Sequence, residues 1–304
     1  MQKYTLFTTR FLTVCILFLA FQLHLHAQTA AIFAPGILSD GQVFGLTLSP
    51  DGQTAVFVKA YGGRDSLHLL TSSLMNGNWT KPIVAPFSTR GTSWKDIDPA
   101  FSPDGKLLLF NSTRPLSMGP AKEDFDIWGV KRDGNSWGEP FHLGAAINTD
   151  SSDIYATIAK SGNIYFSSNR AGGQGKLDLY VSEYQNGVYQ SPKNLGALLN
   201  TENHDSNPFI SPKEDYIIFW GRESSGYGDS DLYISFKQKG NWTKPLNLGP
   251  NINSKQGDFC PFMQPKGKKL YFSRTEEKDG KRIEDLYSID FSPKEWNKLA
   301  KNSN

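Results

Sequence analysis

Four aspartates at equivalent positions are the residues best placed to do chemistry. Asp96, Asp153, Asp205 and Asp258 each stand seven residues before a recurring turn position. Carboxylates gathered in this way could bind a metal ion or a cationic group, or could act in pairs on a glycosidic bond. Repeated Asp/Arg sets, however, more often tie structural elements together by charge-assisted hydrogen bonds. Because a catalytic group is usually unique whereas a structural group recurs, we expect the structural role. The arginines concerned are Arg114, Arg170, Arg222 and Arg274, and a second set of aspartates is Asp126, Asp178, Asp231 and Asp285.

Aromatic residues that break the repeating pattern are better candidates for ligand binding. Trp220 stands where the other repeats have a small or medium-sized residue, Trp94 lies in a long linker, and Tyr227 lies in a Gly-rich loop. Such side chains could stack on a sugar ring or anchor a peptide. The alternative, that they cover the packing between sheets, is the more common role. The predicted ligand-binding set joins these three residues to Arg170, Arg222 and the four aspartates.

Searches for a catalytic centre are negative. Beyond residue 27 the histidines are His68, His142 and His204, at unrelated positions of the repeat. The sequence contains no Gly-x-Ser-x-Gly elbow and no Cys/His cluster with zinc spacing. Cys260 is flanked by aromatic residues and is expected to be a small core residue. We therefore predict no catalytic residue, no metal and no cofactor.

These residues must be positioned by an internal repeat. Turn positions recur at Pro50, Pro103, Lys160, Pro212 and Pro265, with spacings of 53, 57, 52 and 53 residues. An acidic–aliphatic–aromatic triplet such as Asp178-Leu179-Tyr180 follows the turn in four repeats, and the first repeat has the weaker Ser66-Leu67-His68. In every repeat an aromatic residue then follows a further turn. Each unit reads as four antiparallel strands, and no segment shows a sustained helical period. Because one small sheet cannot bury both faces alone, the units must pack around an axis. The prediction is an all-β propeller of five blades, with six as the alternative.

Strand direction sorts the loops onto two faces of the propeller. Face B is the name used here for the side that holds the short turns between the first and second strands of each blade. Face A holds the longer loops between the second and third strands and the linkers between blades. The four aspartates begin the innermost strands near the axis on face A. A ligand site is therefore expected on face A or at the mouth of the central channel.

The two ends of the chain have separate expectations. Residues 1–27 carry a basic start and an apolar stretch ending near Ala27, which indicates a secretory signal peptide. Residues 28–304 form one predicted propeller, with repeats at about 44–94, 95–150, 151–202, 203–255 and 256–304. Ile37-Leu38-Ser39 aligns with Ile147-Asn148-Thr149 in a blade linker, so the N-terminal segment should dock beside the last blade and close the ring. The fourth strand of that blade is expected around Trp296.

Charge and cysteine content limit the partners. Lys3 and Arg10 are the charged residues of the first 27, so 30 basic residues face 30 acidic ones in the rest of the chain. A neutral chain lacks the basic footprint of a nucleic-acid-binding protein. Cys260 is then the single cysteine and no internal disulfide is possible. We expect a monomer with no transmembrane segment after signal removal, either periplasmic or secreted.

The repeats resemble a known family. Runs such as DPAFSPDGKLLLFNSTR, YFSSNRAGGQGKLDLYVS and NWTKPLNLGPNINS are similar to the WD40-like propeller repeat of the TolB type, and especially to the repeats of bacterial cell-envelope proteins that often accompany an OmpA-like domain. The resemblance covers nearly all of residues 28–304 and implies the fold more strongly than the function. The chain stops at Asn304, so we do not expect it to carry an OmpA-like or a peptidase domain. The expected function is a non-catalytic binding or interaction module of the cell envelope, with a protein or glycan partner. The alternative is a glycoside hydrolase or sialidase-like propeller enzyme with carboxylates at the axis.

Overall fold

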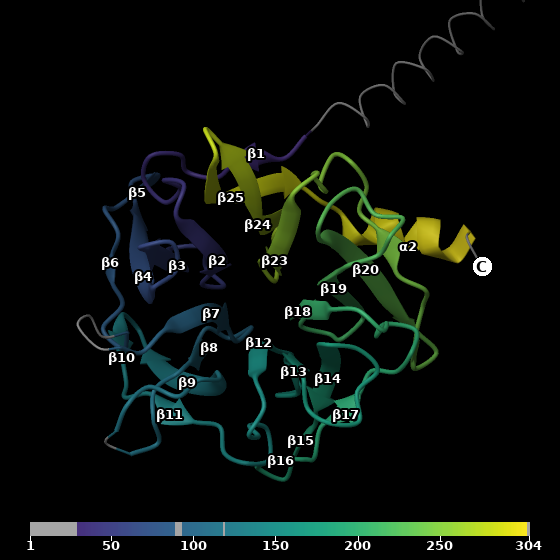
Figure 1. Ribbon diagram of the computed structural model, residues 1–304, viewed down its shortest axis with the longest axis horizontal. Coiled ribbons are helices and arrows are strands. Elements are labelled where there is room, and N and C mark those ends of the chain that lie inside the picture. Colours follow the sequence, from purple (N-terminus) through teal and green to yellow (C-terminus); the bar gives the residue numbers. More distant parts are fainter. Residues whose placement is uncertain (1–28, 89–92, 118, 303–304) are drawn as a thin grey trace, which may run out of the picture.

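The computed structural model describes residues 29–88, 93–117 and 119–302 and shows five antiparallel sheets arranged around a central axis (Figure 1). The prediction of an all-β propeller with five blades is confirmed. In blades 1 to 4 the spatial order of the strands follows their order in the sequence, with the first strand at the axis and the later ones progressively farther out. Blade 1 contains β2 (Val43–Leu48), β3 (Thr54–Tyr61), β4 (Ser66–Met75), β5 (Asn78–Trp79) and β6 (Ile83–Val84); blade 2 contains β7 (Asp96–Phe101), β8 (Leu107–Ser112), β9 (Asp126–Asp133), β10 (Ser136–Trp137) and β11 (Phe141–His142); blade 3 contains β12 (Asp153–Ile158), β13 (Ile164–Ser168), β14 (Asp178–Ser182), β15 (Tyr184–Gln185), β16 (Val188–Tyr189) and β17 (Lys193–Asn194); blade 4 contains β18 (Asp205–Ile210), β19 (Tyr216–Gly221), β20 (Asp231–Gln238), β21 (Asn241–Trp242) and β22 (Leu246–Asn247).

Blade 5 is completed by the N-terminal segment. Its inner strands are β23 (Gly257–Met263), β24 (Lys269–Lys278) and β25 (Lys281–Asp290), and β1 (Ala31–Ile32) pairs antiparallel with the outer edge of β25. This confirms the expected docking of the N-terminal segment and joins it to the last strand of the chain in one sheet. Closing the ring in this way covers a sheet edge that would otherwise be exposed.

The register of this closure differs by one residue from the sequence alignment. Leu38 is fully buried, as Ile147 is, and the Ser39 hydroxyl lies within hydrogen-bonding distance of both the backbone N–H and the carbonyl of Leu286. Asn148 bonds the same two backbone groups of Ile127 in blade 2. Ser39 is therefore the equivalent of Asn148, because burial of the preceding aliphatic residue fixes the register.

The last fourth strand was wrongly predicted. Trp296 lies on helix α2 (Pro293–Asn302), and its indole stacks on Phe291 with ring centroids 6.0 Å apart. The helix has local causes: Ser292 precedes it, Pro293 opens it, and Glu295 completes the Ser-x-x-Glu capping pattern. At ten residues α2 is too short to cross a membrane. Among the described residues no helix is both long enough and apolar enough to do so.

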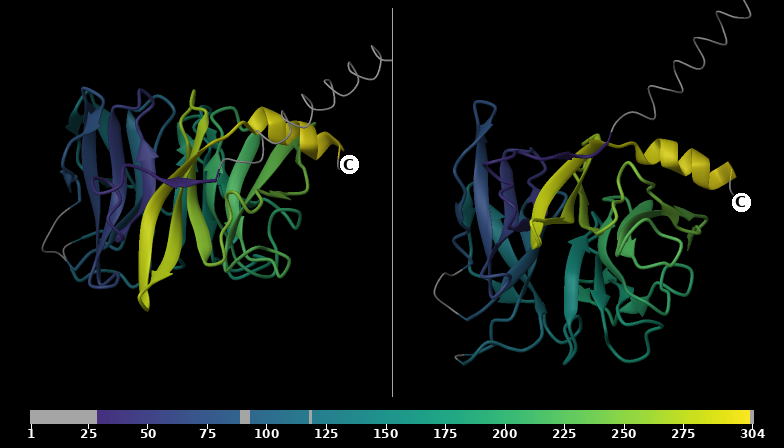
Figure 2. Two further views of the ribbon diagram at one scale, coloured as in Figure 1. Left: turned by 90° about the horizontal axis from the view of Figure 1, so that it is seen from above. Right: turned by 45° about the horizontal axis from the view of Figure 1, so that its top comes forward.

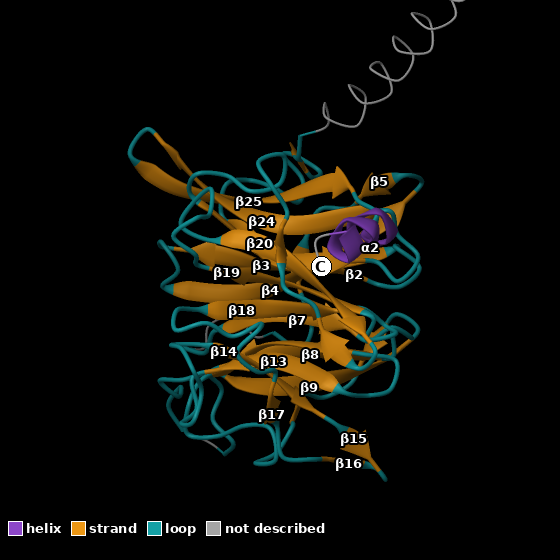
Figure 3. Cartoon of the chain, turned by 90° about the vertical axis from the view of Figure 1, so that its right-hand side faces the viewer, coloured by secondary structure: helices purple, strands orange, loops and turns teal. Residues whose placement is uncertain are grey.

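The hydrophobic core lies between blades. Leu69 of blade 1 shares a buried cluster with Phe110 and Val130 of blade 2, and three similar clusters fill other parts of the ring. When the ring is viewed from its edge, the strands run in roughly the same direction, from one face of the propeller to the other (Figure 3). This packing fixes the position of each strand end on face A.

The two faces differ as expected. On face B the first two strands of each blade meet in tight turns, such as the one in which Gly105 has φ +72° and donates its N–H to the Ser102 carbonyl. On face A the loops are longer, and β24 and β25 extend together as a hairpin that projects past the ring (Figure 2).

Candidate functional site

Three of the four inner-strand aspartates are paired with arginine. The Nη2 atom of Arg114 lies 2.9 Å from Asp96 Oδ1, that of Arg170 lies 2.6 Å from Asp153 Oδ1, and Arg274 Nε lies 2.7 Å from Asp258 Oδ1. The aspartates are almost fully buried. Each arginine also donates to a carbonyl in the linker that precedes its blade. These carbonyls belong to Phe87, Ile147 and Ile252 respectively.

Two aromatic rings hold each of these guanidinium groups. In blade 3 the guanidinium of Arg170 lies 5.0 Å from the centroid of Phe166 and 5.1 Å from that of Tyr180. Arg114 and Arg274 sit over the corresponding ring pairs of their blades. Trp94 lies 5.8 Å from the Arg114 guanidinium, so this indole covers a structural ion pair. The set joins each blade to the end of the preceding one, as repeated Asp/Arg groups are expected to do.

The second set of aspartates anchors the face-A loops. Asp178 accepts hydrogen bonds from the backbone N–H groups of Gln174 and Gly175, and Asp231 accepts them from Tyr227 and Gly228. Tyr227 itself is half exposed, so its ring is free to contact a partner.

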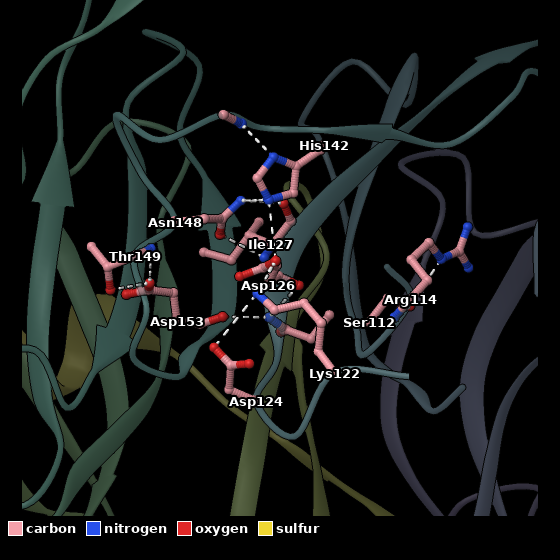
Figure 4. A network of polar contacts seen from close by, with 12 residues as sticks. Ser112, Arg114, Lys122, Asp124, Asp126, Ile127, His142, Asn148, Thr149 and Asp153 are labelled. Carbon is pink, nitrogen blue, oxygen red and sulfur yellow. Dashed lines mark hydrogen bonds and ion pairs between the residues drawn. The ribbon is translucent and has the colours of Figure 1, made fainter. Parts of the chain in front are cut away.

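Blade 2 replaces these loop amides with side chains (Figure 4). Asp126 Oδ2 is 2.5 Å from Lys122 Nζ and 3.3 Å from His142 Nε2, and these interactions hold the pKa of Asp126 below its usual range although burial opposes them. In Figure 4 the network continues from His142 to Asn148. Asp126 Oδ2, Lys122 and His142 are thus engaged with one another, which favours a structural role.

Blade 4 departs from the pattern. Asp205 is only 2% exposed, yet its partners are the Thr201 N–H and hydroxyl, both on Oδ2. Glu223 stands four residues after Phe219, the place of Arg114 and Arg170 in their blades. Arg222 was predicted to belong to this set, but its exposed side chain donates Nε to the Asp229 carbonyl. Burial, opposed by Thr201 and reinforced by the nearby charges of Asp178 and Glu223, raises the pKa of Asp205 to about 6.

Trp220 lies between blades 4 and 5 close to the axis. It packs against a cluster that includes Phe259 and Cys260, and the His204 ring stacks on it at 6.1 Å between centroids. Burial, followed by the charges of Lys176 and Arg222, lowers the pKa of His204. The indole is partly buried, so it serves the packing between blades.

A ring of five residues at the axis was missed by the sequence prediction. Each inner strand has a bulge, and one residue of each bulge has a left-handed backbone with φ between +49° and +62°. Non-glycine residues rarely adopt such a conformation, and it tends to mark functional sites. All five line one narrow axial cavity of about 40 Å³. They are Gly45, Asp98, Tyr155, Asn207 and Cys260.

Two buried polar atoms of this ring have no partner among the described residues, namely Asp98 Oδ2 and Asn207 Nδ2. Asp98 Oδ1 lies 3.8 Å from the Cys260 thiol, and Asn207 Oδ1 accepts the Cys260 N–H at 3.2 Å. Burial raises the pKa of Asp98 well above its usual range, and the nearby Arg64 opposes this only in part. Buried polar groups are normally satisfied, so each exception calls for an explanation such as a bound group.

An ion pair borders the ring. Arg64 forms two hydrogen bonds with Glu284, at 3.1 and 2.7 Å, and its guanidinium covers Phe44 at 4.2 Å from the ring centroid. This pair joins blade 1 to blade 5 beside the axial ring. The repeat position that builds the ring could have been found in the sequence, because it differs in every blade. It stands two residues after each inner-strand aspartate and, in blade 1, two residues after Val43.

The arrangement suits binding better than acid–base chemistry. The enzyme alternative required two or three inner-strand aspartates without arginine partners in an open pocket, whereas Asp205 is the one that lacks an arginine. A cavity of about 40 Å³ has room for a few water molecules and not for a sugar ring, since one water needs about 10–15 Å³. The described residues contain no cluster of three His, Cys, Asp or Glu that could hold a metal ion.

Comparisons with known proteins support the fold and no more. No family model and no curated protein matches the chain. A thermostable family-43 glycoside hydrolase is similar in structure, with a TM-score of 0.57 and 12% identity over 86% of this chain and 93% of that one. A xylan beta-1,4-xylosidase from Bacillus halodurans gives 0.53 and 14%, over 86% and 55% of the two chains. At such identities a shared fold does not transfer an activity.

TolB from Acinetobacter baumannii is also among the similar structures, with 18% identity over 82% of this chain and a TM-score of 0.48. The chain spans 55% of the length of that TolB chain. At this score the likeness carries no argument about function.

Proposed function

We propose that the chain is a non-catalytic binding module of the bacterial cell envelope that docks a partner on face A, at the mouth of the axial channel. The observation that carries this proposal is the axial ring. At this layer of the propeller every blade has a different residue. The ring also contains two buried polar atoms without a described partner.

The non-catalytic role is supported by the state of the carboxylates. Asp96, Asp153 and Asp258 are held by arginine, and Asp126 by Lys122 and His142. Groups fixed in ion pairs are poorly suited to exchange protons with a substrate near neutral pH. The envelope location rests on the sequence of residues 1–27, which lie outside the described part of the chain, and on the family resemblance.

Partner capture with a matched pair of variants tests the proposal. Residues 28–304, immobilised, are exposed to solubilised envelope proteins and to a glycan array, as the wild type, Asp98→Asn and Asp65→Asn. Asp98→Asn keeps the size of the side chain and the acceptor for the Cys260 thiol but replaces the unpartnered Oδ2 with an amide group. Asp65 is an exposed face-A carboxylate and serves as the control.

We expect saturable capture of one partner that Asp98→Asn weakens at least about tenfold and Asp65→Asn leaves unchanged. Capture that is insensitive to Asp98→Asn would place the site elsewhere. Specific turnover of a polysaccharide by the wild type would favour the alternative, a propeller glycoside hydrolase, for which the family-43 enzyme provides a likeness of fold alone.

A further inference from the structure

Three blades contain the same socket for a guanidinium group. In blades 2, 3 and 5 the guanidinium lies over two aromatic rings, bonds Oδ1 of the inner-strand aspartate and donates to a linker carbonyl. In blade 3, for example, the rings of Phe166 and Tyr180 are stacked at 6.0 Å and 25°, and Thr149 holds Asp153 through Oδ2. Oδ1 therefore remains available for Arg170.

Blade 4 retains the aromatic pair, the aspartate and the linker carbonyl of this socket. Phe219 and Tyr233 stack at 6.0 Å and 27°, which matches the geometry of blade 3. Thr201 holds Asp205 through Oδ2 with bonds of 2.6 and 2.8 Å, as Thr149 holds Asp153. The Leu199 carbonyl occupies the linker position of the Ile147 carbonyl, because both residues follow a Gly by three positions and precede the Asn that bonds the third strand.

The guanidinium itself is missing from blade 4. Glu223 replaces the arginine, and Gly221 replaces the serine whose hydroxyl accepts from Arg114 Nε in blade 2 and from Arg170 Nε in blade 3. Asp205 Oδ1 and the Leu199 oxygen accept no hydrogen bond from any residue that the structure describes. Arg222, the neighbouring residue, donates its Nε to the Asp229 carbonyl instead. A nearly fully buried carboxylate thus has one oxygen without a partner.

We propose that this blade-4 socket binds the arginine side chain of a partner protein. The planar guanidinium is the group that the three filled sockets accept, and it can stack on aromatic rings while donating to a carboxylate and a carbonyl at once. The carboxylates of Glu223 and Asp178 add negative charge near the socket and favour a cation. This inference rests on the proposed docking of a partner on face A and selects a protein as that partner, since a glycan has no guanidinium.

A small probe tests the socket without the partner. N-acetyl-arginine-methylamide and its lysine analogue are titrated by calorimetry into the full chain beyond residue 27, as the wild type and as Asp205→Asn, Glu223→Arg and Glu277→Gln. Glu223→Arg restores the arginine that blades 2 and 3 carry at this position and so fills the socket from within. Glu277→Gln removes an exposed carboxylate on the β24–β25 hairpin and is the control.

We expect the arginine probe to bind the wild type with a Kd of about 1 mM and the lysine probe at least about fivefold more weakly. Asp205→Asn should weaken the arginine probe at least about tenfold, Glu223→Arg should abolish binding, and Glu277→Gln should change nothing. Equal binding of the two probes, or unchanged binding to either socket variant, would overturn the inference; if Glu223→Arg does not fold, Asp205→Asn decides alone.

Free arginine as a titrant separates a metabolite from a protein side chain, because a site for peptide-borne arginine should not prefer the free amino acid. Binding of free arginine at least about tenfold tighter than the blocked probe would overturn a protein partner. Failure of the probe with successful Asp98-dependent capture would remove the socket and leave the proposed function. Probe binding without any captured partner would support the socket and remove the proposed function.

Discussion

Replacing Asp205 should have the opposite effect on stability from replacing Asp153. The two aspartates occupy the same position of neighbouring blades and are equally buried, but Asp153 has Arg170 and Asp205 has no cation on it. Because the pKa of Asp205 in the folded protein is about 6, against an ordinary 3.8, the folded protein holds this proton more tightly than the unfolded chain does. Stability should therefore fall as pH rises from about 4 to 6, and the loss is complete above that range.

The size of this loss follows from the difference in pKa. About two pH units at about 1.4 kcal/mol each give an upper bound of about 3 kcal/mol, and relaxation around the carboxylate should reduce it to about 1–2 kcal/mol. Asp205→Asn removes the penalty while its amide oxygen still accepts the Thr201 bonds, so it should be as stable as the wild type at pH 7.5 or about 1–2 kcal/mol more stable. Asp153→Asn leaves the guanidinium of Arg170 without its anion and should lose about 3 kcal/mol.

Urea unfolding between pH 4.5 and 8 measures both variants against the wild type. We expect the free energy of unfolding of Asp205→Asn to approach that of the wild type near pH 4.5 and to meet or exceed it at pH 7.5. A loss for Asp205→Asn as large as that for Asp153→Asn at pH 7.5 would refute the idea that the blade-4 carboxylate lacks a cation.

Three further predictions concern closure and the axial ring. Ser39→Ala removes the hydroxyl that bonds the Phe33 carbonyl and the Leu286 N–H. The protein should lose about 1–2 kcal/mol of unfolding free energy, so the midpoint of thermal unfolding should fall by a few degrees. A fall no larger than that of Ser225→Ala, in an exposed loop, would contradict the closure. Gly45→Ala should lower the unfolding free energy, measured with urea, by about 2 kcal/mol more than Gly187→Ala does. Both glycines have positive φ, but a Cβ at Gly45 would meet Val58 at 3.3 Å, whereas one at Gly187 would meet nothing within 4 Å. Equal losses would count against the tight axial packing. Burial raises the pKa of the Cys260 thiol well above its usual range, so iodoacetamide at pH 8 should label Cys260 only in urea; rapid labelling of the native protein would show an open channel.

Much of the fold was predictable because the blade is a local pattern copied along the chain. The turn and triplet positions recur in step, and the strands begin close to where they indicate, for instance β9 at Asp126 and β20 at Asp231. The N-terminal closure was also predictable, although its register was wrong by one residue because burial of Leu38 decides it. Helix α2 was missed since Trp296 stands where the repeat has an aromatic residue, and the capping pattern around Ser292 outweighs that periodicity.

The site was less predictable, since an alignment by residue type and an alignment by position assign different residues to it. An alignment by type assigns Arg222 to the arginine set, but the spacing from Phe219 puts Glu223 at that position and leaves Asp205 without a cation. The axial ring has no shared residue type at all, so only its register could reveal it. Which polar atoms lack partners, such as Asp98 Oδ2, depends on packing across the ring that one sequence does not encode locally.

A crystal structure of the protein soaked with the blocked arginine probe tests the blade-4 socket most directly. We expect a guanidinium over Phe219 and Tyr233, with hydrogen bonds to Asp205 Oδ1 and the Leu199 carbonyl. The socket is refuted if Arg222 already fills that position, or if the probe is found elsewhere while the blade-4 socket stays closed.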